Sequence, residues 1–211
     1  MIKKNFNSKF SIRNYQQGMT YVELIVVLSI FSIMSAIVLF NHGEFQARVD
    51  IKNLANDVAL KIVEAQKSSI FGTFPSLAQQ ALIASLSTWK PSYGVYFNPI
   101  SDNKSFIFFT DLNSNNLYEG SNCTEECVEK ISITKNNYIS RLDVYYQDLT
   151  TSSLNDLTVS FRRPDSTAFI QSSQIIPPLS SPVFYVQITI SSPNSAQSTI
   201  KLYSSGRVQV N

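Results

Sequence analysis

Residues 18–23, GMTYVE, lead directly into the apolar run LIVVLSIFSIMSAIVLF at residues 24–40. The stretch from Met19 to Phe40 is long enough to cross a bilayer as a helix, because about 20 residues suffice at a rise of about 1.5 Å each. Glu23 is the one charged residue in this stretch. An unpaired carboxylate near the centre of a membrane span costs roughly 2.5 kcal/mol or more, so an acid there indicates function. We therefore expect a partner that neutralises Glu23.

The residues before the apolar run predict its orientation. Residues 1–17 contain no acid and four basic residues: Lys3, Lys4, Lys9 and Arg13. The positive-inside rule then keeps the N-terminus in the cytoplasm and exports the rest of the chain. A secretory signal has its small-residue cleavage site after the apolar run, whereas Gly18 precedes it here. Cleavage after Gly18 would keep the anchor and leave Met19 as a free α-amine near Glu23.

This junction resembles the class III leader of type IV prepilins and pseudopilins, in which a basic leader is followed by Gly, a hydrophobic residue, Thr, two residues and Glu. The resemblance implies that a prepilin peptidase cleaves between Gly18 and Met19 and N-methylates Met19. It assigns Met19, Thr20 and Glu23 to assembly, with Glu23 pairing with the terminal ammonium of Met19 in a neighbouring subunit. Two departures from major pilins are Met19, where Phe is usual, and Phe40, where many have Pro.

The same resemblance implies the partners and the location of the chain. The partners would be other pilin or pseudopilin subunits, the prepilin peptidase, an inner-membrane assembly platform and membrane lipid. The protein would cross the bacterial inner membrane once, with its N-terminus in the cytoplasm and its C-terminal domain exported. It would then enter a pilus or pseudopilus.

The helical pattern continues beyond the apolar run. Apolar residues recur with a spacing of three and four at Ala47, Ile51, Leu54, Val58, Ile62 and Ala65. Gly72 offers a C-cap and Pro75 follows it, so we expect one helix from about Thr20 to Phe71. The predicted organisation is a leader at 1–18, a transmembrane and assembly helix at 19–40, its amphipathic continuation at 41–72 and an exported β-rich domain at 73–211.

The remainder of the chain predicts a sheet domain. Residues 75–90 are interpreted as a short helix or ordered insertion that buries Leu77, Ala81, Ala84 and Leu86. Beyond them β-branched and aromatic residues alternate, which predicts strands at 93–98, 106–111, 129–134, 138–147, 157–161, 167–170, 184–191, 199–204 and 207–210. Loose loops are expected at 150–155 and 171–182. The predicted fold is α+β, a long N-terminal helix packed on an antiparallel β-sheet domain.

Four segments of this domain resemble the H-type (GspH) pseudopilins and FimT-type minor pilins: YGVYF at 93–97, FTDLNSNNLYEG at 109–120, VSFRRPD at 159–165 and SSGRVQV at 204–210. The implied function is a structural subunit of a type IV pilus or a type II secretion pseudopilus. The alternative is a minor pilin that acts as a DNA receptor in natural transformation. DNA-binding FimT-like proteins carry Gly-Arg-x-Arg near the C-terminus, and here Gln209 replaces the second arginine after Arg207. Arg162 and Arg163 offer further phosphate contacts.

Composition speaks against a general DNA-binding surface and against catalysis. The leader supplies four of the 17 Lys+Arg residues, so the chain from Met19 onward has 13 against 15 Asp+Glu, a net charge of −2. Such a chain lacks the basic footprint of nucleic-acid binders. His42 is the single histidine and lies beside the anchor. Asp143, Asp148 and Asp156 are dispersed and are interpreted as surface charges, so we expect no enzyme.

Residues 111–120, DLNSNNLYEG, have two interpretations. Oxygen ligands alternate there as in calcium-binding loops: Asp111, Asn113, Asn115, the Leu117 carbonyl and Glu119. The alternative is a solvated, asparagine-rich hairpin loop that binds no cofactor. The only cysteines, Cys123 and Cys127, follow this loop. On the exported side of a membrane we expect them to form a disulfide, which would stabilise the loop by roughly 2 kcal/mol.

Overall fold

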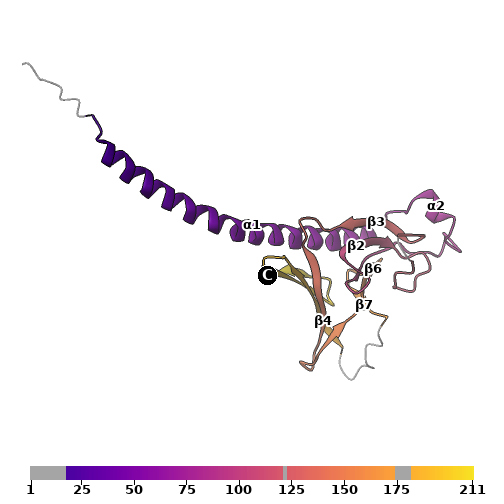
Figure 1. The fold of residues 1–211 in the computed structure, drawn as a ribbon. Helices are drawn as coiled ribbons and strands as arrows, with labels where there is room; N and C mark the ends of the chain where they lie inside the picture. Colours follow the sequence, from indigo (N-terminus) through magenta and orange to yellow (C-terminus); the bar gives the residue numbers. More distant parts are fainter. Residues whose placement is uncertain (1–17, 121–122, 174–181) are drawn as a thin grey trace, which may run out of the picture. The chain divides into compact units, whose positions relative to one another are not determined.

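The computed structural model describes residues 18–120, 123–173 and 182–211, and only the backbone of residues 40 and 41. The basic residues of the leader and most of the expected loop at 171–182 lie outside this part of the chain. The structure divides at Gly43/Glu44 into two compact units. One helix, α1 (Tyr21–Phe71), contributes residues to both units (Figure 1). This confirms the single long helix predicted from about Thr20 to Phe71.

The first unit exposes almost its whole apolar surface. Within α1 as far as Gly43, Val22, Phe31 and Leu39 have exposed fractions of 68%, 68% and 74%. Among the described residues, one helix is long and apolar enough to cross a membrane, and it is α1. Its apolar window is not buried by the chain itself, so this surface needs lipid or other chains to cover it.

The second unit contains two five-stranded antiparallel sheets. The first has the order β3-β2-β1-β6-β7 and consists of β1 (Ser92–Asn98), β2 (Asp102–Thr110), β3 (Cys127–Ser132), β6 (Leu157–Arg162) and β7 (Phe169–Gln171). The second has the order β10-β9-β8-β4-β5 and consists of β4 (Tyr138–Tyr146), β5 (Thr151–Leu154), β8 (Val183–Ser191), β9 (Gln197–Tyr203) and β10 (Val208–Val210). A long helix with antiparallel sheets confirms the predicted α+β fold class.

The core of the second unit lies between the inner stripe of α1 and one face of each sheet. The most deeply buried apolar residues of α1 are Ile51, Ala55, Val58, Ile62 and Ala65. The sheets contribute alternate residues of their strands, among them Val95, Phe97, Val159, Val144, Ile188 and Leu202. The predicted stripe of α1 is confirmed, with Ala55 fully buried and Leu54 only partly buried.

The end of α1 is fixed to the first sheet by a buried hydroxyl. Ser69 Oγ donates a hydrogen bond to the Phe161 carbonyl of β6 at 2.7 Å and accepts one from the Tyr93 N–H of β1 at 2.9 Å. Gly72 then ends the helix with a positive φ of 71°. Its N–H and that of Thr73 bond to the Ser69 and Ser68 carbonyls at 3.2 and 3.0 Å, which is a Schellman C-cap.

The burial predicted for residues 75–90 is wrong. The helix α2 (Leu77–Gln80) has a single turn, capped by Ser76. The four residues expected to be buried are all exposed: Leu77, Ala81, Ala84 and Leu86. Because the chain leaves the helix after one turn, helical spacing does not select a buried face. Instead Ile83 and Trp89 form a small buried cluster with Leu112.

The loop expected at 150–155 is also wrong, because β5 (Thr151–Leu154) lies within it. A tight turn in which the Thr150 N–H donates to Asp148 Oδ1 at 3.0 Å returns the chain. The strand then pairs antiparallel with β4, from Tyr145 opposite Thr151 to Leu142 opposite Leu154. The sequence of this edge strand is mostly polar, with only Leu154 buried, and it therefore lacks the apolar alternation that predicts a strand.

Candidate functional site

The start of α1 is capped by Thr20. Its Oγ1 accepts a hydrogen bond from the Glu23 N–H at 3.3 Å, and its carbonyl accepts one from the Leu24 N–H at 3.1 Å. Thr20 and Glu23 thus occupy the first and last positions of the Thr-x-x-Glu capping pattern. This signal was readable in the sequence and was missed. It gives Thr20 a physical role, because it fixes where the helix begins relative to Met19.

Glu23 lies in the first turn of α1, at the positive end of the helix dipole. A carboxylate there gains about 0.3–1 kcal/mol, which is less than the roughly 2.5 kcal/mol cost of an unpaired charge in a membrane span. The ion pairs between described residues all lie from Glu44 onward. Within the described part of the chain, Glu23 therefore has no ion-pair partner.

The segment from Asp111 to Gly120 is packed on the outer face of the first sheet. Tyr118 contacts the rings of Phe109 and Tyr96, with centroids 5.3 and 4.9 Å apart. The Ser160 hydroxyl donates to the Asn116 carbonyl at 3.3 Å. The segment connects the antiparallel strands β2 and β3 and has the asparagine hydrogen bonds of the expected hairpin loop, but it is only partly solvated, because Asp111, Leu112 and Tyr118 are buried.

The polar atoms of this loop are largely engaged with one another. Asp111 is fully buried, and its carboxylate accepts hydrogen bonds from the N–H groups of Ser114, Asn115 and Asn116 at 2.7, 3.2 and 2.9 Å. Glu119 accepts from the side-chain amides of Asn113 and Asn115 at 2.9 and 2.6 Å.

Three of the predicted calcium ligands, Asn113, Asn115 and Glu119, are hydrogen-bonded to one another, while the Asp111 carboxylate bonds to the loop backbone. Among the described residues there is no group of three or more His, Cys, Asp or Glu side chains that could hold a metal ion. The Leu117 backbone is used as a donor, its N–H bonding to Asn115 Oδ1 at 2.8 Å. Calcium binding stays a prediction, and it would require the oxygens of Asp111 and Glu119 to turn toward a common point.

Glu126 is a buried acid that sequence reasoning did not single out. Its two carboxylate oxygens accept hydrogen bonds from the N–H groups of Leu112 and Glu119, at 3.0 and 2.9 Å. Burial raises the pKa of Glu126 to about 7, although these hydrogen bonds oppose the shift. Burial also raises the pKa of Asp111. The loop at 111–120 is thus fixed to the sheet at both ends by carboxylates.

Cys123 and Cys127 form a disulfide in the structure, with Cα atoms 4.8 Å apart. Cys127 begins β3, and its carbonyl accepts a hydrogen bond from Gln79 Nε2 at 3.1 Å. The bridge encloses Glu126 between its two cysteines. It therefore restrains the backbone that carries this buried acid.

The three arginines predicted for DNA contact have their contacts with different elements. Arg207 lies over the Tyr203 ring of β9, with 4.0 Å to the ring centroid. Arg162 lies 5.3 Å from the Phe169 ring centroid and donates to the Ser114 carbonyl at 3.3 Å. The Arg163 guanidinium lies against Gly72 at the end of α1.

The aspartates interpreted as surface charges are only partly so. Asp143 and Asp156 have exposed fractions of 4% and 5%, which makes that interpretation wrong for both. Asp143 accepts from Arg141 Nε and Ser153 Oγ, each at 2.8 Å. Asp156 accepts from the Ser172 hydroxyl at 3.0 Å. These contacts link neighbouring strands and turns. His42 is exposed on α1 and lies far from these aspartates in the sequence.

Comparison with known proteins identifies the N-terminal segment. The family described as the prokaryotic N-terminal methylation motif matches residues 13–39. No curated protein and no solved structure matches the chain. The chain thus carries a type IV prepilin-like class III leader, as predicted. The motif supports a pilin- or pseudopilin-like subunit and implies processing by prepilin peptidase and assembly with other pilins. One N-terminal apolar helix beside it is consistent with a single-pass membrane anchor.

Proposed function

We propose that this protein is a minor pilin or pseudopilin, a structural subunit of a type IV pilus or a type II secretion pseudopilus. Prepilin peptidase cleaves it between Gly18 and Met19 and methylates the new amino terminus. The subunit then enters the filament through its N-terminal helix. The observation that carries this proposal is Glu23, an acid in the first turn of an apolar helix whose chain supplies no ion-pair partner in its described part.

The cleavage creates the charge that Glu23 lacks. Before cleavage Met19 is linked to Gly18 through a neutral peptide bond, and after it Met19 carries an ammonium group. Pairing this group with Glu23 of a neighbouring subunit removes two charge penalties from the apolar phase. Assembly is thereby coupled to processing, because an uncleaved chain offers the acid without the amine.

The minor class is supported by the sheet domain. Four segments resemble H-type pseudopilins and FimT-type minor pilins. They contribute to β1 (93–97), to the loop packed on the first sheet (109–120), to β6 (159–165) and to β10 (204–210). Two five-stranded sheets accommodate the late strands that major pilins generally lack. The proposal applies equally to a pilus and to a secretion pseudopilus.

The test is incorporation of Glu23→Ala in cells that contain the cognate assembly system. We expect the variant to be cleaved and to insert into the membrane as the wild type does. Its amount in the sheared filament fraction should fall at least tenfold. Immunoblots of the membrane and filament fractions measure both quantities.

Glu44→Ala is the matched control, because Glu44 is an acid on the same helix outside the apolar run, paired with Arg48 at 2.6 Å on the exposed surface. This variant should assemble like the wild type. Normal incorporation of Glu23→Ala would refute the proposal that pairing of Glu23 with the Met19 ammonium of a neighbouring subunit drives assembly. It would equally exclude a requirement for pairing of Glu23 with Met19 of its own chain.

A second candidate function, DNA receptor, is favoured by the outer face of the second sheet. Tyr145, Tyr185 and Tyr203 form a row across β4, β8 and β9, with centroids 4.4 and 5.4 Å apart. Lys201 lies 5.1 Å from the Tyr185 centroid, and Arg207 lies over Tyr203. Aromatic side chains beside cations are the elements that bind single-stranded nucleic acid.

A mobility-shift assay with the full-length protein and single-stranded DNA at low salt tests this function. Arg207→Ala should then abolish the retarded band, while Arg48→Ala, an exposed arginine on α1, should leave it unchanged. No retarded band for the wild type would reject the DNA-receptor function and leave the structural one intact.

A further inference from the structure

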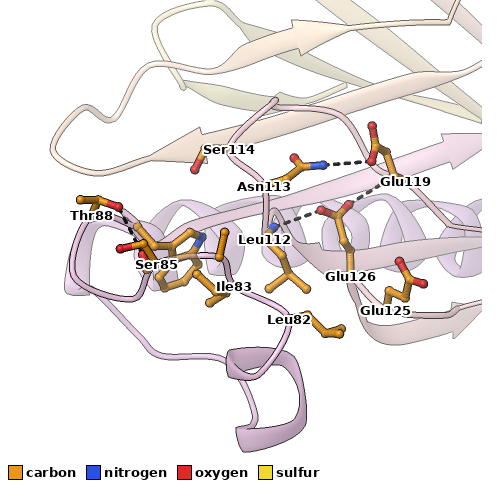
Figure 2. A pocket seen from close by; sticks show the side chains of 12 residues that line it. Leu82, Ile83, Ser85, Thr88, Leu112, Asn113, Ser114, Glu119, Glu125 and Glu126 are labelled. Atoms are coloured by element: carbon orange, nitrogen blue, oxygen red, sulfur yellow. Dashed lines mark hydrogen bonds between the residues drawn. The ribbon is translucent and has the colours of Figure 1, made fainter.

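Residues 73–90, which connect α1 to β1, are called the 73–90 insertion below. A cavity of about 450 Å³ lies where this insertion meets the loop packed on the first sheet. Its volume is within the range of ligand-binding sites. Figure 2 shows Leu82, Ile83 and Leu112 along one part of the wall, with Glu119, Glu125 and Glu126 on the other. Trp89 also lines the cavity. Apolar and acidic surfaces therefore lie side by side.

In the described part of the wall, no basic side chain lies opposite the acidic residues of the cavity. Glu126 and Glu119 receive their hydrogen bonds from neutral donors, namely backbone N–H groups and asparagine amides. Glu125 is exposed at the same wall. The described residues that line the cavity include no Lys, Arg or His. Arg162, which approaches the loop from β6 and bonds to Ser114, is not among them.

The insertion beside the cavity leaves apolar side chains in solvent. Phe74, Leu77, Leu82 and Leu86 have exposed fractions of 61%, 83%, 56% and 46%. Exposed apolar side chains that cluster in one segment mark protein interaction sites more often than isolated ones do. The buried cluster of Ile83, Trp89 and Leu112 holds the segment in place beneath them.

We propose that this cavity binds a lysine or arginine side chain of a partner protein, with the apolar neighbours of that side chain lying on the 73–90 insertion. The charged end of the side chain meets the three carboxylates, and its methylene stem lies along Leu82, Ile83 and Trp89. Long basic side chains bury their stems on apolar surface in this way. This docking site is additional to the N-terminal helix and does not depend on the filament role.

Charge complementarity selects this occupant over a metal ion. A hard cation needs six to eight oxygens converging on one point, and the acids here are not arranged as a metal-holding group. An ammonium or guanidinium group carries its own hydrogen-bond donors and tolerates carboxylates that are spread around it. The apolar wall would add nothing to metal binding, whereas it matches a side-chain stem.

Trp89 is the only tryptophan of the chain and lines the cavity, so its fluorescence reports occupancy directly. Full-length protein in detergent micelles is titrated with the blocked tripeptide Leu-Lys-Leu and, separately, with its norleucine analogue, which has no amine. We expect a saturable change in Trp89 emission with the lysine peptide and at least tenfold weaker binding of the analogue.

Glu125→Gln should weaken binding of the lysine peptide several-fold without affecting the fold, because this side chain is exposed. Glu129→Gln, an exposed acid of β3 outside the cavity, is the matched control and should bind like the wild type. Glu126→Gln should weaken binding of the lysine peptide more strongly. If the Glu126→Gln variant does not fold, the result for Glu125→Gln tests the proposal.

Three results would overturn the proposal. The first is no saturable change with the lysine peptide. The second is equal binding of the norleucine peptide, which would make the cavity a purely apolar groove. The third is a calcium chloride titration that produces the same emission change and displaces the peptide, which would make the cavity a metal site.

Discussion

The two parts of α1 differ in how far their apolar side chains are buried. From Tyr21 to Leu39 the helix is mostly apolar and exposes nearly all its side chains, and it contains a single acid. From Glu44 to Phe71 one apolar stripe is buried by the sheets of the same chain, while Phe45, Leu60 and Phe71 stay exposed. The outer surface of this second part carries ion pairs, such as that of Lys61 with Glu129 at 2.9 Å.

This difference separates folding from assembly along one helix. Residues of the second part are stabilised by contacts that the chain makes with itself. Residues of the first part are not covered by the described part of the chain, and we expect their contacts to come from lipid or from other subunits. Substitutions should therefore change the stability of the globular unit when they lie in the second part, and change only assembly when they lie in the first.

The largest effect on stability is expected from a matched pair of truncations. Ile62→Ala removes a fully buried side chain from the core and should lower the free energy of unfolding by about 2–5 kcal/mol. Ile30→Ala truncates a residue with an exposed fraction of 51% and should change that free energy by less than about 0.5 kcal/mol. Urea unfolding of the full-length proteins in detergent, followed by Trp89 fluorescence, measures both. Similar losses for the two variants would contradict the division of roles.

Two acids in apolar surroundings extend the comparison to pH. We propose that Glu23 pairs with a charge from another chain, whereas Glu126 accepts hydrogen bonds from its own loop and has its pKa raised to about 7 by burial. Because burial raises this pKa above its ordinary value of 4.5, the folded protein binds more protons than the unfolded chain between these two values. Stability should therefore fall as the pH rises from 5 to 8, by roughly 2 kcal/mol.

Glu126→Gln tests this dependence, because the amide cannot titrate. Burial raises the pKa of Asp111 as well, so its effect on stability has the same sign. Hydrogen bonds from Ser105 and Lys130 lower the pKa of Asp102 to about 2. Titration of Asp102 therefore changes the free energy of unfolding mainly below pH 3.8, its ordinary pKa, and not between pH 5 and 8. Urea unfolding at pH 5 and pH 8 should show a flatter profile for the variant. An unchanged profile would remove Glu126 as the cause.

A pair of serines gives the smallest expected difference. Ser69→Ala leaves the buried Tyr93 N–H without its partner and should cost about 1–3 kcal/mol of unfolding free energy. Ser29→Ala removes only a hydroxyl bonded to the Ile25 carbonyl of its own helix, and should cost less than about 0.5 kcal/mol. The same urea titrations check this pair, and equal losses would show that the Ser69 contacts to β1 and β6 contribute nothing.

The parts of this fold that follow from local periodicity were predictable. The stripe from Ile51 to Ala65 repeats with the period of a helix, and Gly72 ends it with the positive φ that glycine permits. The leader was also predictable, since its basic residues, Gly18 and Glu23 all lie within the first 23 residues of the sequence. Contacts between distant residues were not predictable. Nothing near Ser69 indicates that Phe161 and Tyr93 will be its partners.

The burial of the candidate loop was not predicted, for a related reason. Its asparagines indicate solvent or calcium when considered alone, yet Tyr118 packs on Phe109, a residue of the preceding strand, and draws the loop onto the sheet. Burial of Glu126 depends on the backbone of Leu112 and Glu119, which no spacing rule encodes. The short helix α2 likewise ended before helical spacing could take effect.

The most direct test of the central claim is the N-terminal sequence and intact mass of the mature protein isolated from its membrane. We expect a chain that begins with N-methylated Met19, so that the amine lies close to Glu23. An intact leader, or a new terminus beyond Phe40, would contradict the account, because neither product carries both the apolar helix and its free amine.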